Sequence, residues 1–390
     1  MKTNLRDFTN ASSRRSSLEA DLNISLESIS QFSFTEEEVS GRNIENLIGA
    51  TQIPLGIAGP VAINHQPSAI SHHYIPLATT EGALVASISR GAKAITESGG
   101  AHIEYQNVGV TRAPVFKTQG IKQNVEVKKW LGENFDEIKN LCESTSSHLK
   151  LIKIDSNFAG RSLFIRFSFD SEDAMGMNMA TIATEKAVEF ITKATGIECL
   201  SLSGNYDVDK KPAWINFING RGKRVWADVT IKKEVVESVL KTTSDKICNL
   251  ILRKVLTGSV MAGSMGFNAH FANIVAAIFA ATGQDLGQVS EGSIGITAGE
   301  TLDNGDLYFS IFMPNLMIGT VGGGTNLPTQ KEALKIMGIK DKGDTKKFAM
   351  IIAASVLAGE LSLLASQSEG TLAKAHIKLG RKDQKIKGSE

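Results

Sequence analysis

The sequence of 390 residues has little cysteine, proline or aromatic content: three Cys, eight Pro and 6% Phe, Trp and Tyr. Cys142, Cys199 and Cys248 are far apart and odd in number, with no Cys-x-x-Cys spacing. This pattern excludes a disulfide framework and a zinc site, and it is typical of a reducing compartment. We therefore expect a cytoplasmic protein without a bound metal.

The sequence also lacks an excess of positive or negative charge, because 42 Lys and Arg are balanced by 41 Asp and Glu, which gives a formal net charge of +1. Because the charges are interspersed, we expect neither nucleic acid nor an anionic membrane as a partner. Arg14-Arg15 is a twin arginine, but no apolar export segment follows it. The longest apolar run, 348–365, carries Glu360 and falls short of the roughly 20 residues that a membrane helix needs, so it predicts a core helix.

What the sequence does have is enough apolar residues, 42%, to fill real cores in more than one unit. We predict an α+β fold that begins with a short helical segment over residues 1–44. Residues 45–113 and 203–390 form a large α/β domain around a central helix. Residues 114–202 alternate helix and strand, which is typical of an inserted sandwich of the split βαβ kind.

The loop 204–212 holds two acids and two lysines within five residues, bounded by turn formers. A lysine held close to carboxylates stays charged and can polarise a carbonyl as negative charge develops on its oxygen. The ordinary alternative for such a loop is a solvated turn. Because apolar segments at 197–202 and 214–218 flank the loop, we expect its charges to be buried and functional.

Glu81 is a second candidate. Thr79 and Thr80 are each a plausible N-cap for the apolar helix 83–95, which places Glu81 in the first helical turn. There it is either a plain capping acid or, at the buried end of a core helix, a proton donor.

Asp285 follows the apolar helix 274–281 at its C-terminal end, against the preference of the helix dipole. It therefore needs a cation, and we predict that this cation is Lys210. His270, just before the same helix, is either a satisfied core histidine or a substrate contact.

Two glycine-containing motifs suit a nucleotide. Residues 173–179 open a helix with free backbone N–H groups and a glycine that permits close approach, which suits a phosphate. The Gly-x-Gly-x-x-Gly spacing is missing, so a Rossmann domain is disfavoured. The glycine string 319–326 either lets the backbone approach a flat ligand or forms a tight turn. His376 stands alone near a basic chain end, where a histidine is usually inert.

In this order, the motifs resemble those of the 3-hydroxy-3-methylglutaryl-CoA (HMG-CoA) reductase family, over about residues 41–381. The resemblance rests on Glu45-Asn46-Leu47-Ile48-Gly49, Ala78-Thr79-Thr80-Glu81-Gly82, Asp173-Ala174-Met175-Gly176-Met177-Asn178-Met179, Ser203-Gly204-Asn205, Asp209-Lys210-Lys211-Pro212, Asn268-Ala269-His270, Gly283-Gln284-Asp285 and Gly319-Thr320-Val321-Gly322-Gly323-Gly324-Thr325-Asn326. The Thr-Thr-Glu-Gly and Met-Gly-Met-Asn-Met forms are similar to the biosynthetic class. The membrane anchor of eukaryotic members is absent, as in the soluble form.

The resemblance implies that the inserted domain is ferredoxin-like and binds the dinucleotide. It implies NADPH as cofactor and HMG-CoA, mevalonate and CoA as substrate and products. It also implies a homodimer, or a higher oligomer built from dimers, with active sites at the subunit interface and residues 45–49 in the dimer contact.

The resemblance also implies roles for individual residues. The catalytic set is Glu81, Lys210, Asp285 and His376. The hydroxymethylglutaryl group is held by Ser203, Asp209, Lys211, Lys254, His270 and Asn273, of which Lys254 and Asn273 reach the neighbouring subunit's site. The cofactor positions are Arg112, Ser146, Ser147, Lys150, Asp173, Met175, Gly176, Met177, Asn178, Val321, Gly322 and Gly323.

The expected reaction is the four-electron reduction of HMG-CoA to mevalonate and CoA with two NADPH. Lys210, beside Asp285 and Glu81, stabilises the oxyanion, Glu81 protonates the aldehyde oxygen, and His376 protonates the departing thiolate. The alternatives are NAD-linked mevalonate oxidation by the same family and a non-catalytic CoA- or nucleotide-binding module. The serine whose phosphorylation silences eukaryotic members corresponds to Lys382, so we expect that control to be missing.

Cofactor preference depends on one short stretch. The family's biosynthetic class grips the 2′-phosphate of NADPH partly with a Ser-Arg pair, and the matching residues here are Ser146 and Ser147. Loss of the guanidinium removes a charge-assisted contact worth on the order of 1.5 to 3 kcal/mol. Lys150, or His148 beside it, can compensate, and 144–151 holds no acid of the kind that an NAD-selective site uses. We expect NADPH to be preferred over NADH, less strictly than in relatives with the arginine.

Overall fold

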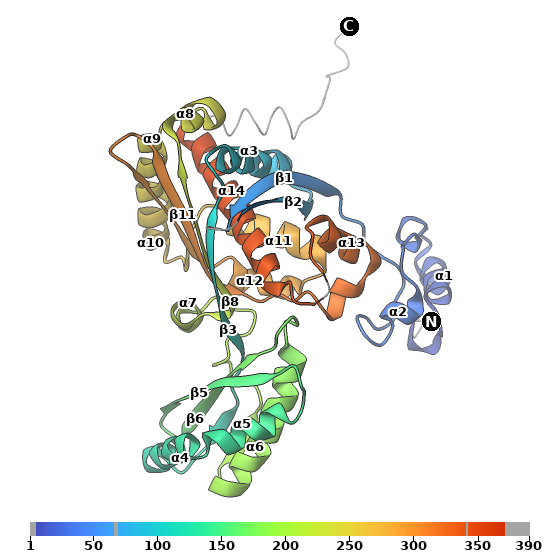
Figure 1. Cartoon of the computed structure of the whole chain (residues 1–390). Helices are drawn as coiled ribbons and strands as arrows, with labels where there is room; N and C mark the ends of the chain where they lie inside the picture. Colours follow the sequence, from blue (N-terminus) through green and yellow to red (C-terminus); the bar gives the residue numbers. More distant parts are fainter. Residues whose placement is uncertain (1–4, 66–68, 341, 371–390) are drawn as a thin grey trace.

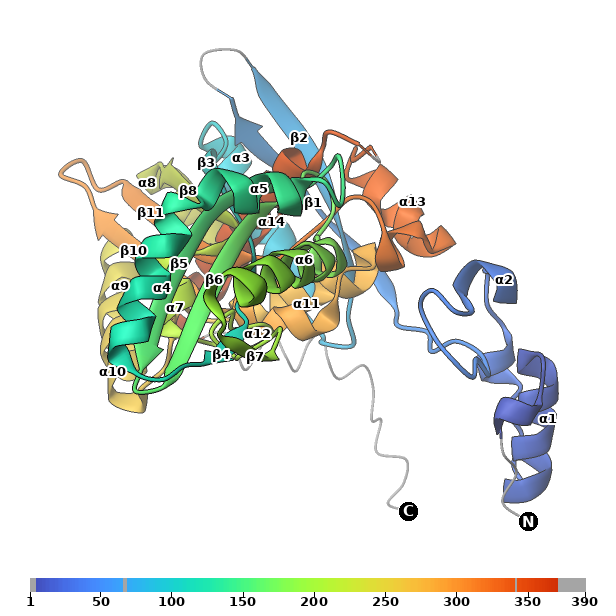
Figure 2. The ribbon, with the colours of Figure 1, turned by 90° about the horizontal axis from the view of Figure 1, so that it is seen from below.

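The computed structural model describes residues 5–65, 69–340 and 342–370. Figure 1 shows an N-terminal segment at one side of a large body and a smaller lobe below that body. Figure 2, turned by 90°, again shows the N-terminal segment projecting from the body. The predicted mixed α and β architecture is confirmed.

The N-terminal segment is helical, as predicted. Its main helix, α1 (Ala11–Leu22), begins where the Asn10 side chain accepts a hydrogen bond from the Ser13 N–H. A small core of Ala11, Val39 and Leu47 holds the segment together, and Leu327 of the large body packs against it. The other short helices here are η1 (Leu5–Asp7), η2 (Ser28–Ser30) and α2 (Glu36–Val39).

The large body is built around α14 (Thr345–Ser368), which is apolar on all sides and buried along nearly its whole length. At 24 residues it is longer than the apolar run suggested and could cross a membrane by length and composition. Its burial shows why it is a core helix instead, since 89% of its most apolar window is inside the fold. Helix α3 (Leu84–Glu97) packs closely on α14, and glycine at position 91 permits this. A Cβ there would lie only 1.9 Å from the Ala358 carbonyl oxygen.

Further elements complete this body. The hairpin of β1 (Leu55–Asn64) and β2 (Ile70–Ala78) is antiparallel and covers α3 and α11 (Phe271–Thr282). The remaining helices are α7 (Trp214–Asn219), α8 (Lys233–Val235), η3 (Val236–Leu240), α9 (Ser244–Leu250), η4 (Ile251–Gly258), α10 (Ser259–Ala262), η5 (Leu286–Gln288), α12 (Val289–Gly292), η6 (Gly323–Asn326) and α13 (Pro328–Ile336).

One sheet runs through both the body and the lobe, in the order β7-β4-β6-β3-β8-β11-β10-β9. Strand β3 (His102–Arg112) joins the two parts: its first residues pair with β8, and Val110 to Arg112 pair with β6. The body's other strands are β8 (Arg221–Ile231), β9 (Gly266–Phe267), β10 (Gly295–Thr301) and β11 (Leu307–Leu316).

The smaller lobe has the predicted ferredoxin-like topology. Its elements follow the order βααββαβ, and its four strands lie in the order β7-β4-β6-β5. A separate hydrophobic cluster, which includes Phe116, Phe167 and Ile191, forms its core. The elements are β4 (Val115–Lys117), α4 (Ile121–Glu133), α5 (Phe135–Glu143), β5 (Lys150–Ala159), β6 (Ser162–Asp170), α6 (Met177–Thr195) and β7 (Glu198–Ser201).

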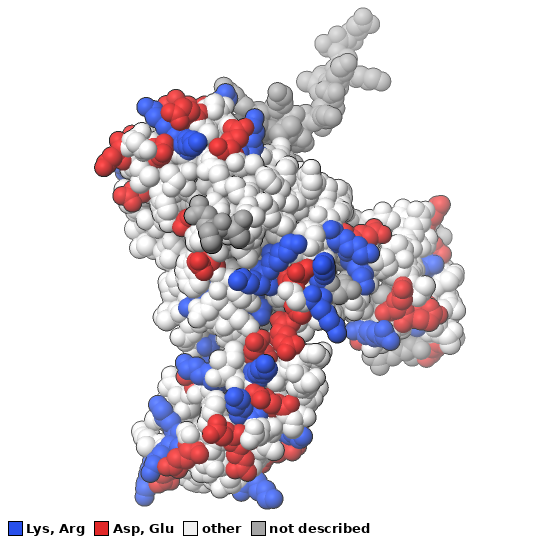
Figure 3. Space-filling model, viewed as in Figure 1, with Lys and Arg blue, Asp and Glu red and all other residues white. Residues whose placement is uncertain are grey.

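Charged side chains are intermixed over the face shown in Figure 3, as the net charge of +1 suggests. This surface therefore presents no long-range field of one sign to steer a charged partner.

Candidate active site

Lys210 and Asp285 form the ion pair that the sequence predicts. The Lys210 Nζ lies 2.7 Å from the Asp285 Oδ2, and both side chains are partly exposed. The other carboxylate oxygen of Asp285 accepts a hydrogen bond of 3.0 Å from the Gly287 N–H at the start of η5. Asp285 is therefore fixed at a helix start, and it holds a cation where a substrate can reach it.

The loop that carries Lys210 is conformationally unusual. Asn205, Val208 and Lys210 have φ angles of +62°, +52° and +57°, in the left-handed region that glycine favours. For the β-branched Val208 this conformation is a genuine outlier, and each such residue costs of order 1 to 3 kcal/mol unless the surroundings hold it. A strained backbone at the predicted lysine indicates that its placement is imposed by contacts.

The expected burial between apolar flanks is wrong. Trp214 and Ile218 of α7 are 53% and 70% exposed on this chain, and Leu200 before the loop is 58% exposed. The loop acid Asp207 is nonetheless fully buried, and so are Arg221 and Glu291 beneath the loop.

Arg221 and Glu291 form an ion pair of 2.7 Å between Nη1 and Oε1. The Arg221 Nη2 also lies 3.0 Å from the Asp209 Oδ1, which accepts a further hydrogen bond of 2.8 Å from the Gln288 amide. Burial alone would raise the pKa of Asp209, but Arg221 and Gln288 outweigh it and hold that pKa below its ordinary value. Burial raises the pKa of Glu291, and Arg221 opposes this. Sequence reasoning identified neither Arg221 nor Glu291, because the two are far apart in the chain and carry no local signal.

Glu81 lies differently from the prediction. Helix α3 begins only at Leu84, after Ala83 in a left-handed conformation with φ of +74°. The Thr79 hydroxyl accepts a hydrogen bond of 3.0 Å from the Glu81 N–H and so closes a turn before the helix. Glu81 is therefore an exposed loop residue and not a first-turn capping acid. Among the side-chain contacts of the residues that the structure describes, none joins Glu81 to Lys210.

A chain of polar contacts links a predicted substrate residue to a predicted cofactor residue. The exposed Ser203 donates its hydroxyl to the Asp207 Oδ2 at 3.0 Å. The same oxygen of Asp207, which is fully buried, lies 3.1 Å from the Arg112 Nη1. Arg112 in turn donates to the Thr181 hydroxyl of α6 at 2.9 Å. Asp207 is one of the loop acids whose burial the sequence predicts, but its link between Ser203 and Arg112 was not predicted.

His270 is held by its backbone, and its ring is not satisfied. Its N–H donates to the Glu360 Oε1 at 2.6 Å, whereas its Nε2 is buried and has no hydrogen-bond partner among the residues that the structure describes. The described residues therefore do not satisfy the His270 ring, which favours the substrate contact over the core histidine. The other predicted substrate residues, Lys211, Lys254 and Asn273, are exposed.

The two predicted nucleotide motifs lie side by side. Ala174 and Val321 form a parallel bridge, and the Thr320 N–H donates to the Asp173 carbonyl at 2.8 Å. A Cβ at Gly319 would lie 2.6 Å from the Met175 nitrogen, so the close approach requires glycine. Of the neighbouring cofactor positions, Gly176 is the N-cap of α6, Met177 is its first residue, Asn178 is exposed, and Gly322 and Gly323 face open space.

The same glycine string forms the short turn η6, which is the tight turn that the sequence allows, and its approach to a flat ligand stays a prediction. The carboxylate of Asp173 is occupied within the fold: it accepts hydrogen bonds from the Gly343 N–H at 2.7 Å and the Thr345 hydroxyl at 2.9 Å, and so fixes the start of α14. Backbone groups at the start of α6 remain the groups that suit a phosphate.

At the predicted 2′-phosphate position, the fold adds an acid. Ser146 contacts Met179 of α6, and Ser147 and Lys150 are exposed. The Glu172 Oε2 lies 2.7 Å from the His148 Nδ1, although 144–151 itself holds no acid. His376 and Lys382 lie outside the described residues.

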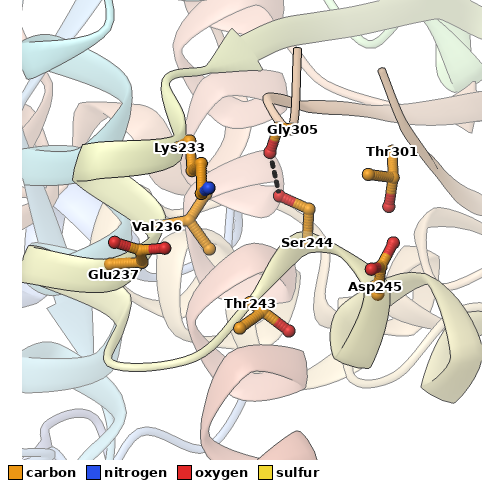
Figure 4. Close-up of a pocket in the computed structure, with 8 residues that line it drawn as sticks. All are labelled: Lys233, Val236, Glu237, Thr243, Ser244, Asp245, Thr301 and Gly305. Atoms are coloured by element: carbon orange, nitrogen blue, oxygen red, sulfur yellow. Dashed lines mark hydrogen bonds between the residues drawn. The ribbon is translucent and has the colours of Figure 1, made fainter. Parts of the chain in front are cut away.

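A pocket of about 300 Å³ lies apart from all these residues (Figure 4). The Ser244 hydroxyl donates to the Gly305 carbonyl at its edge, at 2.8 Å. Lys233, Glu237 and Asp245 also line it, and none of the predicted site residues does.

Comparison with known proteins identifies the family. The family model described as hydroxymethylglutaryl-coenzyme A reductase matches residues 10–381. The chain is 48% identical over 369 residues to the 3-hydroxy-3-methylglutaryl-coenzyme A reductase of Methanothermobacter thermautotrophicus, covering 94% of this chain and 92% of that protein. It is 50% identical over 374 residues to the protein of that name from Methanocaldococcus jannaschii, with coverage of 94% and 92%.

Among solved structures, the chain is similar to the class II 3-hydroxy-3-methylglutaryl-CoA reductase from Streptococcus pneumoniae bound to NADPH, with a TM-score of 0.69. The identity is 18% and the coverage is 93% of this chain and 98% of that one, so this likeness shows the fold. On the family match and the two curated relatives, the chain belongs to the hydroxymethylglutaryl-coenzyme A reductase family.

Proposed function

We propose that the protein reduces HMG-CoA to mevalonate and CoA and consumes two NADPH. The observation that carries this proposal is the Lys210–Asp285 pair of 2.7 Å, partly exposed on a strained loop in a member of this family. Such an ammonium group is placed to stabilise an oxyanion on a substrate carbonyl.

The residues divide the work between two reductions. NADPH, when bound, would supply the hydride for each reduction, with a first molecule used for the thioester and a second for the aldehyde. Lys210 stabilises the oxyanion in both steps, and Asp285 holds its ammonium group in place. Glu81 gives a proton to the aldehyde oxygen, and His376 gives one to the departing CoA thiolate.

The residues around the nucleotide motifs suit NADPH. Gly319 allows the backbones of the two motifs to lie close together, and the open Gly322 and Gly323 leave room for a ligand. The α6 N-terminus offers N–H groups to a pyrophosphate. Lys150, exposed at the start of β5, is our candidate for the 2′-phosphate contact.

The proposal includes a homodimer with shared active sites. Within one chain, Glu81 is exposed and makes no contact with Lys210, which supports a site that a second chain completes. Exposed apolar side chains on the body suit such a contact, since Met261 and Ile218 are 83% and 70% exposed. Lys254 and Asn273, also exposed, would then reach the neighbouring site.

We also propose the division into residues 1–44, 45–113 with 203–390, and 114–202, which is supported by separate hydrophobic cores for the body and the lobe. Three free cysteines support a cytoplasmic location.

The test is turnover of HMG-CoA, followed by nicotinamide absorbance. Lys210→Ala should lower kcat by at least about 100-fold, because an oxyanion-stabilising group is lost. Lys335→Ala, which removes an exposed lysine on α13, is the matched control and should leave kcat unchanged. Near wild-type turnover by Lys210→Ala would show that the assignment is wrong. The same assay with mevalonate and CoA tests the oxidative direction, and absence of turnover in both directions would favour a binding module.

A further inference from the structure

The main chain of Lys210 is anchored to a buried acid. The Lys210 N–H donates to the Glu291 Oε1 at 2.5 Å. Lys210 has a left-handed φ of +57°, which a residue with a side chain adopts only where contacts hold it. Glu291 supplies such a contact directly at the strained residue.

Glu291 is itself fixed by a fully buried cation. Its Oε1 lies 2.7 Å from the Arg221 Nη1, and both side chains are fully buried. Because removing one partner of a buried pair leaves an uncompensated charge, the two are expected to act as a unit. Arg221 also reaches the Asp209 Oδ1 at 3.0 Å. The pair thus holds two consecutive loop residues, Asp209 through its side chain and Lys210 through its backbone.

The second oxygen of Glu291 extends this hold to the other strained residue. The Asn216 amide donates to the Glu291 Oε2 at 3.2 Å and to the Val208 carbonyl at 3.1 Å. The side-chain oxygen of Asn216 accepts a hydrogen bond of 2.7 Å from the buried Arg166. Val208 and Lys210, the two strained residues next to Asp209, are therefore fixed by one network.

The same short segment also holds the other end of Lys210. Residues 285–291 contain Asp285, which pairs with the Lys210 ammonium, and Glu291, which accepts from the Lys210 main chain. The lysine is thus attached at both ends to η5 and α12. Two-point attachment leaves the ammonium little freedom to move relative to a carbonyl oxygen.

We propose that Glu291, paired with Arg221, is a positioning residue for Lys210: it imposes the strained backbone that aims the ammonium group at the reacting carbonyl. This inference rests on the proposed role of Lys210 as the oxyanion-stabilising group. Glu291 is fully buried and is not expected to touch substrate.

The experiment compares Glu291→Ala with Glu291→Gln. Alanine removes the acceptor for the Lys210 N–H, and we expect kcat to fall by about 100-fold, since a misplacement near 1 Å has that effect. Glutamine keeps an acceptor oxygen of the same reach, so kcat should recover to within about tenfold of wild type. The KM for NADPH should change less than about twofold in both, because Glu291 does not contact the nucleotide motifs. Reduction of added mevaldehyde should fall in parallel, since Lys210 acts in both steps.

Two controls separate the possible outcomes. Ile247→Ala removes a fully buried side chain of α9 elsewhere in the same core and reports what lost stability alone does to kcat. If Glu291→Ala lowers kcat no more than Ile247→Ala does, or if Glu291→Gln is as impaired as Glu291→Ala, the proposal is overturned. Should Glu291→Ala not fold, Glu291→Asp replaces it: its carboxylate is one methylene shorter and cannot reach the Lys210 N–H from the same place, so kcat should fall below that of Glu291→Gln, and wild-type kcat in Glu291→Asp overturns the proposal. Lys210→Ala is measured beside them, because its retained turnover would refute the proposed function rather than the positioning role.

Discussion

Replacing Glu360 by alanine should be among the most damaging single changes in the core. Glu360 lies within α14 and is fully buried, yet it faces three donors. Its Oε1 accepts from the His270 N–H at 2.6 Å. Its Oε2 accepts from the Ala269 N–H at 2.8 Å and from the Thr297 hydroxyl at 2.6 Å. The carboxylate therefore fixes the two residues that precede α11, while the Asn268 Oδ1 accepts from the Phe271 N–H at the helix start.

The magnitude follows from those contacts. A hydrogen bond to a charged group contributes about 1.5 to 3 kcal/mol, so two orphaned main-chain donors cost about 3 to 6 kcal/mol. The Thr297 hydroxyl can turn to another acceptor, so we leave it out of the sum. Since a domain is stable by only about 5 to 15 kcal/mol, Glu360→Ala should bring the body close to unfolding at 25 °C. Glu360→Gln keeps one acceptor oxygen and should lose about half as much.

Urea unfolding followed by circular dichroism measures this loss. Ser355→Ala is the matched control, because Ser355 is equally buried on α14 but donates only to Ile351 of its own helix, at 2.7 Å. It should cost less than about 1 kcal/mol. In Glu360→Gln, which stays folded, the KM for HMG-CoA should rise because only one of the Ala269 and His270 N–H groups keeps its acceptor, which loosens the segment that carries His270. Equal losses of stability in Glu360→Ala and Ser355→Ala would refute the reasoning.

Three further predictions concern the site. Glu81→Gln chains and Lys210→Ala chains should each be inactive alone, but a mixture that forms random dimers should regain about a quarter of wild-type turnover. Half of the dimers then contain one chain of each kind, and one of the two sites in such a dimer is intact. No recovery would show that both residues of a site come from one chain. The pKa of Asp209 is lower in the folded protein than in the unfolded chain, where it is about 3.9. The ionised side chain therefore stabilises the fold above about pH 3.9, and this stabilisation is lost as the pH falls through the pKa of the folded state. The urea midpoint of Asp209→Asn should therefore fall less than that of wild type between pH 7 and about pH 3, and parallel curves would contradict this. Lys150→Ala should lower the ratio of kcat/KM for NADPH to that for NADH, because a lysine attracts the 2′-phosphate. Glu172→Gln should raise this ratio, because a carboxylate repels the phosphate. A ratio unchanged in both variants would show that the 2′-phosphate does not bind near Lys150 and Glu172.

Several features were predictable because one segment contains the whole signal. The run 348–365 is apolar on every side, and only a buried helix accommodates such a segment. The alternation of helix and strand over 114–202 is similarly local and gave the ferredoxin-like lobe. The pairing of Asp285 with Lys210 was predictable from physical need, since an acid at that end of a helix requires a cation.

Other features depend on groups that only the fold brings together. Arg221 and Glu291 are 70 positions apart, and neither lies in a pattern that requires the other. Glu172 reaches His148 from the turn between β6 and α6, so a search of 144–151 alone could not find it. Glu81 was misplaced because a threonine before a helix can close a turn as well as cap the helix. Thr79 closes the turn, and Ala83 then takes the left-handed conformation at the true start of α3.

Helix α11 connects the core to both halves of the chemistry. Glu360 holds the two residues before its first turn, and its last turn leads into Gln284 and Asp285. The Gln284 side chain accepts a hydrogen bond of 3.0 Å from the Gly319 N–H, which opens the glycine string on the nucleotide side. Asp285, the next residue, holds the Lys210 ammonium. Two adjacent residues at the end of one buried helix therefore join the glycine string to the loop that carries Lys210. A larger residue at Gly359, where a Cβ would lie 2.4 Å from the Ile274 Cδ1 and 3.4 Å from the His270 Nε2, should displace both α11 and His270 and so lower kcat.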